Sequence, residues 1–172
     1  SSSAALNEFQ MILAAKASAP FVIRKLLEQI KDKYDYIIID CPPAKNQLTV
    51  AALVAADKVI IPTEPEYFAA DGVTLMLSDI IQDVKDNYNP NLKVEGFLIV
   101  KYKSRFKENL YIVELLETIA REIFNTKVFE TKIRDTVAIP TSQREGKNIF
   151  EFDRNCNASQ DYLRLIREMT AA

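Results

Sequence analysis

A run of apolar residues that ends in an acid and two prolines constrains the fold of this chain most. Residues 36–39 are Tyr-Ile-Ile-Ile, and they lead directly into Asp40, Cys41, Pro42 and Pro43. An uninterrupted apolar strand is typical of a parallel sheet that is covered on both faces. Asp40 would then stand at the carboxyl end of the strand, where open parallel sheets bind their ligands. Its carboxylate suits Mg²⁺, directly or through water; the alternative is that Asp40 merely ends the strand or caps a helix.

The rest of the chain alternates between strand-like and helix-like periodicity. Apolar runs predict strands over residues 36–40, 58–62, 94–100 and 127–133, the last of them more exposed and near a sheet edge. Apolar residues at helical spacing predict helices over residues 6–16, 20–30, 48–56, 68–87, 108–124 and 157–169. Strands that alternate with crossover helices indicate an α/β fold, with a mostly parallel sheet and helices on both faces. We expect residues 1–172 to form a single domain.

Composition excludes several kinds of site. The chain has no histidine, which removes serine–histidine and cysteine–histidine pairs and every histidine-ligated metal site. Its glycines are Gly72, Gly96 and Gly146, too far apart for a phosphate-binding loop, and no Gly-Lys-Ser/Thr occurs. Cys41 and Cys156 fit no zinc or redox spacing. We predict that both are small buried residues in a reducing compartment.

Neither a membrane nor a secretory route is predicted. No apolar run approaches the ~20 residues that cross a bilayer, and the first residues lack the basic start of a signal peptide. Residues 161–172 already fit as a closing helix, with nothing after them for an amphipathic membrane anchor. A cytoplasmic location is therefore the expectation.

Two groups of basic residues are candidate nucleic-acid contacts, although the net charge of −2 does not itself predict such binding. The first group follows the predicted strand at 94–100 and consists of Lys101, Lys103, Arg105 and Lys107, interleaved with Tyr102 and Phe106. It could contact phosphates without reading sequence. The alternative is a solvated loop whose cations balance nearby acids.

The second group lies near the end of the chain and consists of Arg144, Lys147, Arg154, Arg164 and Arg167. Asp161 and Glu168 dilute the pair on the last predicted helix. Ion pairs within that helix are therefore the alternative interpretation.

Four blocks of the sequence resemble a known family. Residues 34–43, Tyr-Asp-Tyr-Ile-Ile-Ile-Asp-Cys-Pro-Pro, resemble the Walker-B segment of ParA-type chromosome and plasmid partition ATPases, which are relatives of MinD. Further matches follow in the family's order at residues 53–72, at 128–134 and in a tail that contains 146–147 and 151–153. The resemblance covers nearly the whole chain and implies a P-loop NTPase-like fold.

The resemblance also implies roles for individual residues. Asp40 would be the catalytic acid that organises Mg²⁺ and the attacking water near the phosphates of ATP, and Pro42, with Pro43, would hold the adjacent loop. Two pairs would face the adenine base, namely Lys101 with Tyr102 and Ile133 with Arg134, although the proline usual in the family's version of the second pair is missing here. For DNA, the testable positions are Arg134, Arg144, Lys147, Arg164 and Arg167.

The family's activity implies ATP and Mg²⁺ as cofactors and a homodimer in the ATP-bound state. That dimer would bind DNA without sequence preference, on the nucleoid, and a ParB-like centromere-binding protein would stimulate hydrolysis and release. The sequence leaves open whether the cargo is a plasmid, a chromosome or a protein assembly.

One departure from the family is large. Its lysine-bearing glycine loop, which binds the β- and γ-phosphates, has no counterpart here. Residues 1–6 resemble the segment just after the family's third strand, so we expect this sequence to begin in mid-domain, with the N-terminal strands missing. ATP hydrolysis is then expected only when that portion is present, and not for the 172 residues alone. The alternative is a P-loop-less, non-catalytic module of the same fold that binds DNA or protein.

Overall fold

The computed structural model describes residues 19–41, 46–65, 67–103 and 108–170. The chain divides into two compact units. Unit 1 comprises Ser1–Val59 and Leu75–Lys93, and unit 2 comprises Ile60–Thr74 and Val94–Ala172. We describe each unit by itself. The helix predicted at residues 6–16 lies outside the described residues.

Most of the predicted elements are confirmed to within two residues. In chain order the elements are η1 (Ala19–Phe21), α2 (Val22–Leu27), η2 (Lys31–Lys33), α3 (Gln47–Ala55), β1 (Lys58–Thr63), α4 (Tyr67–Asn87), β2 (Lys93–Ile99), α5 (Glu108–Glu122), α6 (Ala138–Arg144), α7 (Ile149–Phe152) and α8 (Asn157–Thr170). Helices α6 and α7 were not predicted. Pro140 falls in the first turn of α6, where its missing N–H costs no helical hydrogen bond, so the helix tolerates a residue that usually breaks one.

Strands β1 and β2 are paired and parallel, as the predicted fold class requires. At their beginnings Lys93 N–H donates to the carbonyl of Asp57, and at their ends Val100 N–H donates to Thr63, at 3.0 Å in both cases. Helix α4 connects them in the chain. The α/β fold with parallel strands and intervening helices is thus confirmed.

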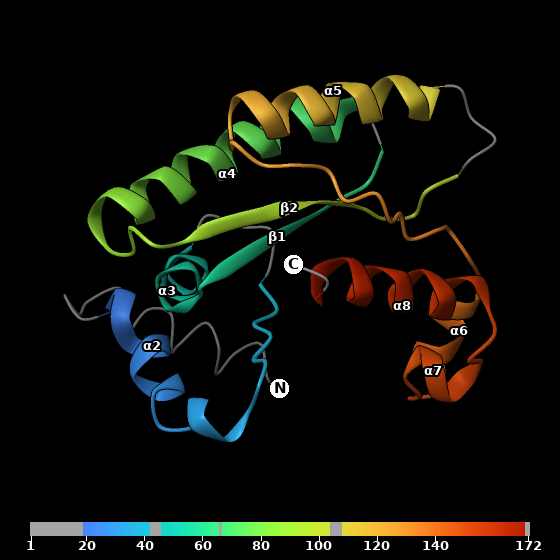
Figure 1. Ribbon diagram of the computed structural model, residues 1–172, viewed down its shortest axis with the longest axis horizontal. Coiled ribbons are helices and arrows are strands. Elements are labelled where there is room, and N and C mark those ends of the chain that lie inside the picture. Colours follow the sequence, from blue (N-terminus) through green and yellow to red (C-terminus); the bar gives the residue numbers. More distant parts are fainter. Residues whose placement is uncertain (1–18, 42–45, 66, 104–107, 171–172) are drawn as a thin grey trace. The chain divides into compact units, whose positions relative to one another are not determined.

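The two faces of β2 are both covered in unit 2, which explains its continuous apolar run. Phe97 packs edge-to-face on Phe124, just after α5, with ring centroids 5.1 Å apart. Leu98 instead joins a core cluster with Leu165 of α8. Successive side chains of a strand point to opposite faces, so α5 and α8 lie on opposite sides of β2 (Figure 1).

The predicted strand at 127–133 occurs in an interrupted form. It runs parallel to β2 through isolated bridges, Phe97 with Val128 and Tyr102 with Arg134. Phe129 N–H donates to Phe97 and Ile133 N–H donates to Ile99, so four residues on this segment advance beside two on β2. Residues 130–132 thus lie opposite residue 98 alone, and with two residues in excess they bulge out of the ladder.

Three expectations about burial are wrong. Residues 36–40 form no strand, and Ile38 and Tyr36 are 93% and 76% exposed. An apolar run is buried as a strand only when neighbouring strands and helices cover it, and none of the described residues pairs with this one. The helix expected over residues 20–30 is shorter, because α2 ends at Leu27. Its apolar stripe is not buried, and Leu26 is 57% exposed. Cys41 is exposed, and Cys156 is only half-buried.

Candidate functional site

The carboxyl ends of the parallel segments in unit 2 meet at one edge, and charged side chains follow each of them. Lys101, after β2, forms an ion pair with Glu64, after β1. Lys103 forms a second ion pair, at 3.3 Å, with Asp135, which follows the 127–134 segment. These contacts are those expected if the cations of this loop balance nearby acids. Arg105 and Lys107, predicted in the same group, lie outside the described residues.

Lys101 adopts a backbone conformation that favours glycine. Its φ angle is +51°, in the left-handed region that a side chain with a Cβ enters at a cost. The turn at this residue lets Tyr102 N–H donate to the carbonyl of Ile133 at 3.0 Å, which extends the pairing beyond β2. Strained positions of this kind concentrate at functional sites, so the feature adds weight to this edge as a candidate site.

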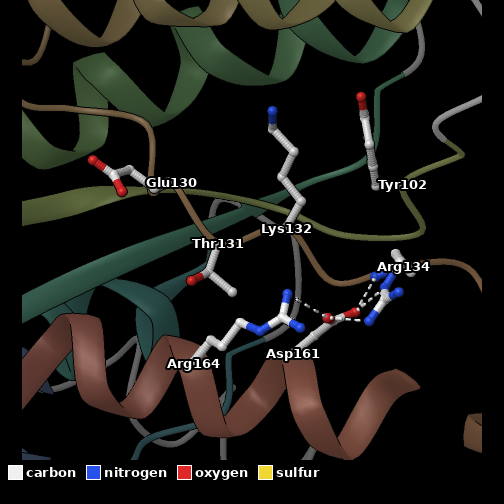
Figure 2. A pocket seen from close by; sticks show the side chains of 7 residues that line it. All are labelled: Tyr102, Glu130, Thr131, Lys132, Arg134, Asp161 and Arg164. Atoms are coloured by element: carbon white, nitrogen blue, oxygen red, sulfur yellow. Dashed lines mark hydrogen bonds and ion pairs between the residues drawn. The ribbon is translucent and has the colours of Figure 1, made fainter. Parts of the chain in front are cut away.

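An open pocket of about 410 Å³ lies beside this edge (Figure 2). Its lining comes from three parts of the chain. Tyr102 follows β2, four residues belong to the 127–134 segment, and two belong to α8. The four are Glu130, Thr131, Lys132 and Arg134, and the two are Asp161 and Arg164. Three predicted site residues, Tyr102, Arg134 and Arg164, are therefore brought together here. Lys132 was not predicted, and its ammonium lies 5.1 Å from the centre of the Tyr102 ring, a cation–π contact.

Arg134 is held by a buried carboxylate at the pocket wall. Its Nε and Nη2 atoms donate to Asp161 Oδ2 and Oδ1 at 2.8 and 2.7 Å, and its backbone N–H donates to Oδ2 at 3.1 Å. The hydrogen bond to Asp161 raises the pKa of Arg134 above its ordinary value. Arg164 approaches the same carboxylate more loosely, with Nη1 3.8 Å from Oδ1.

Glu168, two turns further along α8, holds the bulge itself. Its carboxylate accepts the backbone N–H groups of Glu130 and Thr131 at 2.8 and 3.0 Å. Burial of the carboxyl raises its pKa, but the hydrogen bonds from Thr131 and Glu130 and the charge of Lys127 outweigh this and leave the pKa below its ordinary value. Glu168 is therefore ionised while it holds the bulge.

The other predicted residues of unit 2 lie elsewhere. The side chain of Ile133 is 2% exposed and packs in the core with Leu98 and Phe129, so it does not line the pocket. Arg144 and Lys147 are exposed, and Lys147 pairs with Glu145 at 2.9 Å. Arg167 is exposed on α8. These placements leave DNA contacts by the exposed residues as predictions.

Sequence reasoning missed Asp161 and Glu168 as structural ligands of the bulge. A signal was present, because acids seven residues apart lie on one face of a helix. We interpreted them as partners of Arg164 and Arg167 within the helix. The ion pair of Asp161 with Arg164 within the helix does occur, at 3.8 Å, but the shorter contacts of both acids are with the 130–134 segment.

Asp40 belongs to unit 1, whereas the pocket belongs to unit 2. Asp40 is exposed, which suits a carboxylate ligand of Mg²⁺, but within the described ranges no group of three or more Cys, Asp or Glu side chains converges on a metal position. The described residues therefore do not by themselves form a complete Mg²⁺ site. Pro42, which was expected to hold the adjacent loop, lies outside them.

Comparison with known proteins identifies the family. A family model described as an AAA domain matches residues 1–94. The chain is 36% identical to the chromosome-partitioning ATPase Soj of Treponema pallidum, over 87% of this chain and 57% of that protein. It is 38% identical to the chromosome partitioning protein ParA of Myxococcus xanthus, over 95% of this chain and 56% of that protein. The chain belongs to the ParA/MinD superfamily of P-loop ATPases.

A solved structure of a differently named enzyme shares the fold. Cobyrinic acid a,c-diamide synthase of Mycobacterium smegmatis, with bound ADP and magnesium, is 27% identical and superposes with a TM-score of 0.71, over 92% of this chain and 57% of that one. The chain thus spans a little over half the length of each of these three proteins. No helix in the described ranges is both long and apolar enough to cross a membrane.

Proposed function

We propose that this ParA/MinD-type chain acts in DNA partition, as part of an ATPase that moves a plasmid or a chromosome. The observation that carries the proposal is its similarity, over 87% and 95% of its length, to two proteins named for chromosome partitioning. In this proposal the protein dimerises when ATP is bound, and the dimer binds DNA without sequence preference. A ParB-like protein stimulates release, and the protein resides on the nucleoid in the cytoplasm.

ATP and Mg²⁺ are the cofactors of this proposal, and magnesium supplies charge neutralisation at the phosphates. Asp40 is the residue of this chain that we assign to the metal and to the attacking water, because its exposed carboxylate is the acid of the Walker-B-like segment. The glycine–lysine loop that binds phosphates in P-loop proteins has no counterpart in the 172 residues. We therefore assign hydrolysis to a protein that supplies this loop, and not to the chain alone.

The position of Tyr102 in the pocket of unit 2 supports a role for its ring in contacting the adenine base. Its ring lines the open pocket, and Lys101 precedes it in the strained turn. A flat ring beside an open pocket can contact an adenine face. The side chain of Ile133 is packed in the core, so we limit the proposed base contacts to Lys101, Tyr102 and the neighbourhood of Arg134.

Replacement of Asp40 tests the catalytic part of the proposal. In an ATPase that contains this chain, Asp40→Ala should abolish hydrolysis while the protein remains folded, because it removes the exposed carboxylate that we assign to the metal and to the attacking water. Asp35→Ala is the matched control, since it removes a second exposed acid from the same segment. Undiminished ATP turnover by the Asp40→Ala protein would refute the role of Asp40.

A second candidate function is a non-catalytic module that binds DNA or protein. The absence of a phosphate loop from the sequence favours it for the chain alone. A filter-binding assay on the protein that contains this chain, with and without ATP, separates the two functions. Binding to DNA that ATP does not alter would support the module, and binding that needs ATP would support the partition ATPase.

A further inference from the structure

Two arginines approach one buried carboxylate in the pocket, but their contacts differ in kind. The side chain of Asp161 is only 2% exposed. Arg134 donates to both of its oxygens at 2.7 and 2.8 Å, whereas Arg164 reaches only one, at 3.8 Å (Figure 2). A bidentate pair with a buried carboxylate is a strong, directed interaction. A long pair made by an exposed side chain contributes little.

The oxygens of Asp161 are largely taken up by Arg134. Oδ2 accepts from both the backbone N–H and Nε of Arg134, and Oδ1 accepts from its Nη2. Oδ1 can accept one further hydrogen bond, but Arg164 approaches it only to 3.8 Å. Its side chain is 64% exposed, compared with 37% for Arg134, so its guanidinium remains accessible to a molecule in the pocket.

The contact with Arg134 is also part of how α8 holds the outer side of the bulged segment. The inner side of the segment pairs with β2, while the N–H groups of Glu130, Thr131 and Arg134 donate to Glu168 and Asp161. Two carboxylates of α8 thus take the place of a neighbouring strand along this stretch. Removing the Arg134 side chain would leave a buried charge without its main partner, which is costly.

We propose that Asp161 divides two tasks between the arginines: Arg134 is a positioning residue that fixes residues 130–134 against α8, and Arg164 binds an anionic phosphate group that enters the pocket. The lining carries three cations, Lys132, Arg134 and Arg164, and two acids, Glu130 and Asp161, for a formal charge of +1 that favours an anion. A guanidinium matches the geometry of a phosphate. That the phosphate belongs to DNA rests on the proposed function. The assignment of Arg134 as a positioning residue removes it from the predicted DNA contacts.

The first test compares Arg164→Gln with Arg134→Gln in binding to a short DNA duplex over a range of salt concentrations. Arg164→Gln should lower the slope of log K against log[salt] by about 1 and leave the melting temperature unchanged. Arg134→Gln should lower the melting temperature and leave the slope unchanged. Arg134→Lys keeps the charge but loses the bidentate fork, so it should not restore the melting temperature. The proposal would be overturned if Arg134→Gln lowered the slope of log K against log[salt] while Arg134→Lys and Arg164→Gln left it unchanged. Arg134 would then be the residue that contacts the phosphate.

Two NMR measurements test the same assignment without DNA. Hydrogen exchange of the Glu130, Thr131 and Arg134 amides should accelerate in Arg134→Lys and stay slow in Arg164→Gln. Titration of the wild-type chain with inorganic phosphate should shift the side-chain Nε–Hε signal of Arg164 and leave that of Arg134 in place. The reverse pattern in either measurement would overturn the proposal. If the wild-type chain did not bind the DNA duplex, the proposed function of DNA binding would be contradicted. The titration with inorganic phosphate would still test separately whether Arg164 binds a phosphate group.

Discussion

The side-chain amide of Asn89 donates a hydrogen bond to the backbone carbonyl of Ala56, 2.8 Å away, at the end of α3. The same amide lies 3.1 and 3.2 Å from the carbonyls of Leu53 and Val54. The last carbonyls of a helix have no partner within it. The last turn of α3 includes the buried residues Leu53 and Val54, so its carbonyls need a donor from elsewhere in the protein. Asn89 is thus the cap of a helix whose end, at Ala56, lies 33 residues earlier in the chain.

Asn89→Ala should therefore destabilise unit 1. It removes the Asn89 donor from the carbonyls of Leu53 and Ala56, whereas the carbonyl of Val54 keeps a donor in Arg24. A buried carbonyl left without a donor costs ~1–3 kcal/mol. Urea unfolding followed by circular dichroism measures the free energy of unfolding. Asn91→Ala is the control, because Asn91 is exposed in the same turn and its removal should have little effect. Equal stability of the two variants would contradict the capping role.

Gly96 is required by close packing in unit 2 and not by its backbone conformation. A Cβ at this position would lie 2.9 Å from the carbonyl oxygen of Lys127 and 3.0 Å from the ring of Phe129. Gly96→Ala should push the 127–134 segment away from β2 and cost ~1–3 kcal/mol, as overpacking typically does. Hydrogen exchange of the Phe97 and Phe129 amides should accelerate.

Gly146→Ala is the matched control for that prediction. Gly146 has a φ of +66° and open space around its α-carbon, so alanine would strain its backbone without touching the sheet. Its N–H and that of Lys147 close the end of α6 by donating to Gln143 and Ser142. The control should loosen the end of α6 and leave the exchange of the Phe97 amide unchanged.

Cys41 should react slowly with alkylating reagents although it is exposed. Partial desolvation raises the pKa of its thiol, and the neighbouring charge of Asp40 raises it further. A raised pKa lowers the thiolate fraction at neutral pH, and the thiolate is the nucleophile. In a Cys156→Ser background, Asp40→Asn should increase the rate of iodoacetamide modification at pH 8, whereas Asp35→Asn should not. A rate that Asp40→Asn leaves unchanged would show that Asp40 does not act on the thiol.

Local pattern in the sequence predicts elements well where a helix or strand finds its partners within the described chain. The apolar runs at β1 and β2 are paired, and β2 is buried in its second half. Leu165, Tyr162 and Met169 of the α8 stripe pack in the core, although Ile166 of the same stripe is 49% exposed. The equally apolar run that contains Ile38 is extended and exposed, because the pattern does not say which strands flank it. Burial is thus a property of the neighbours as much as of the run itself.

The candidate site was predictable in part for the same reason. Tyr102 and Arg134 follow the ends of parallel segments, so topology alone brings them to one edge. The bulge at residues 130–132 cannot be predicted from the local sequence, because it depends on a hydrogen bond from Thr131 N–H to the carboxylate of Glu168 on α8. The pairing of Arg134 with Asp161 likewise arises from a contact between segments 27 residues apart.

The contribution of Glu168 to stability should disappear in acid. The pKa of its carboxyl is lowered in the folded protein from an ordinary value of 4.5, so the unfolded chain binds a proton more readily there. Its stabilisation is therefore fully present above pH 4.5 and is lost as the pH falls through the lowered folded pKa. Glu168→Gln should be less stable than the wild type at pH 7, and the difference should shrink steadily below pH 4.5.

Urea unfolding of both proteins between pH 3 and pH 7 measures this difference directly. Glu117→Gln, at an exposed position on α5, is the control and should track the wild type over the same range. Amide exchange at Glu130 and Thr131 gives a local readout, because protonated Glu168 is a weaker acceptor for these two N–H groups. A stability difference that stays constant down to pH 3 would mean that the carboxylate charge of Glu168 does not hold the bulge.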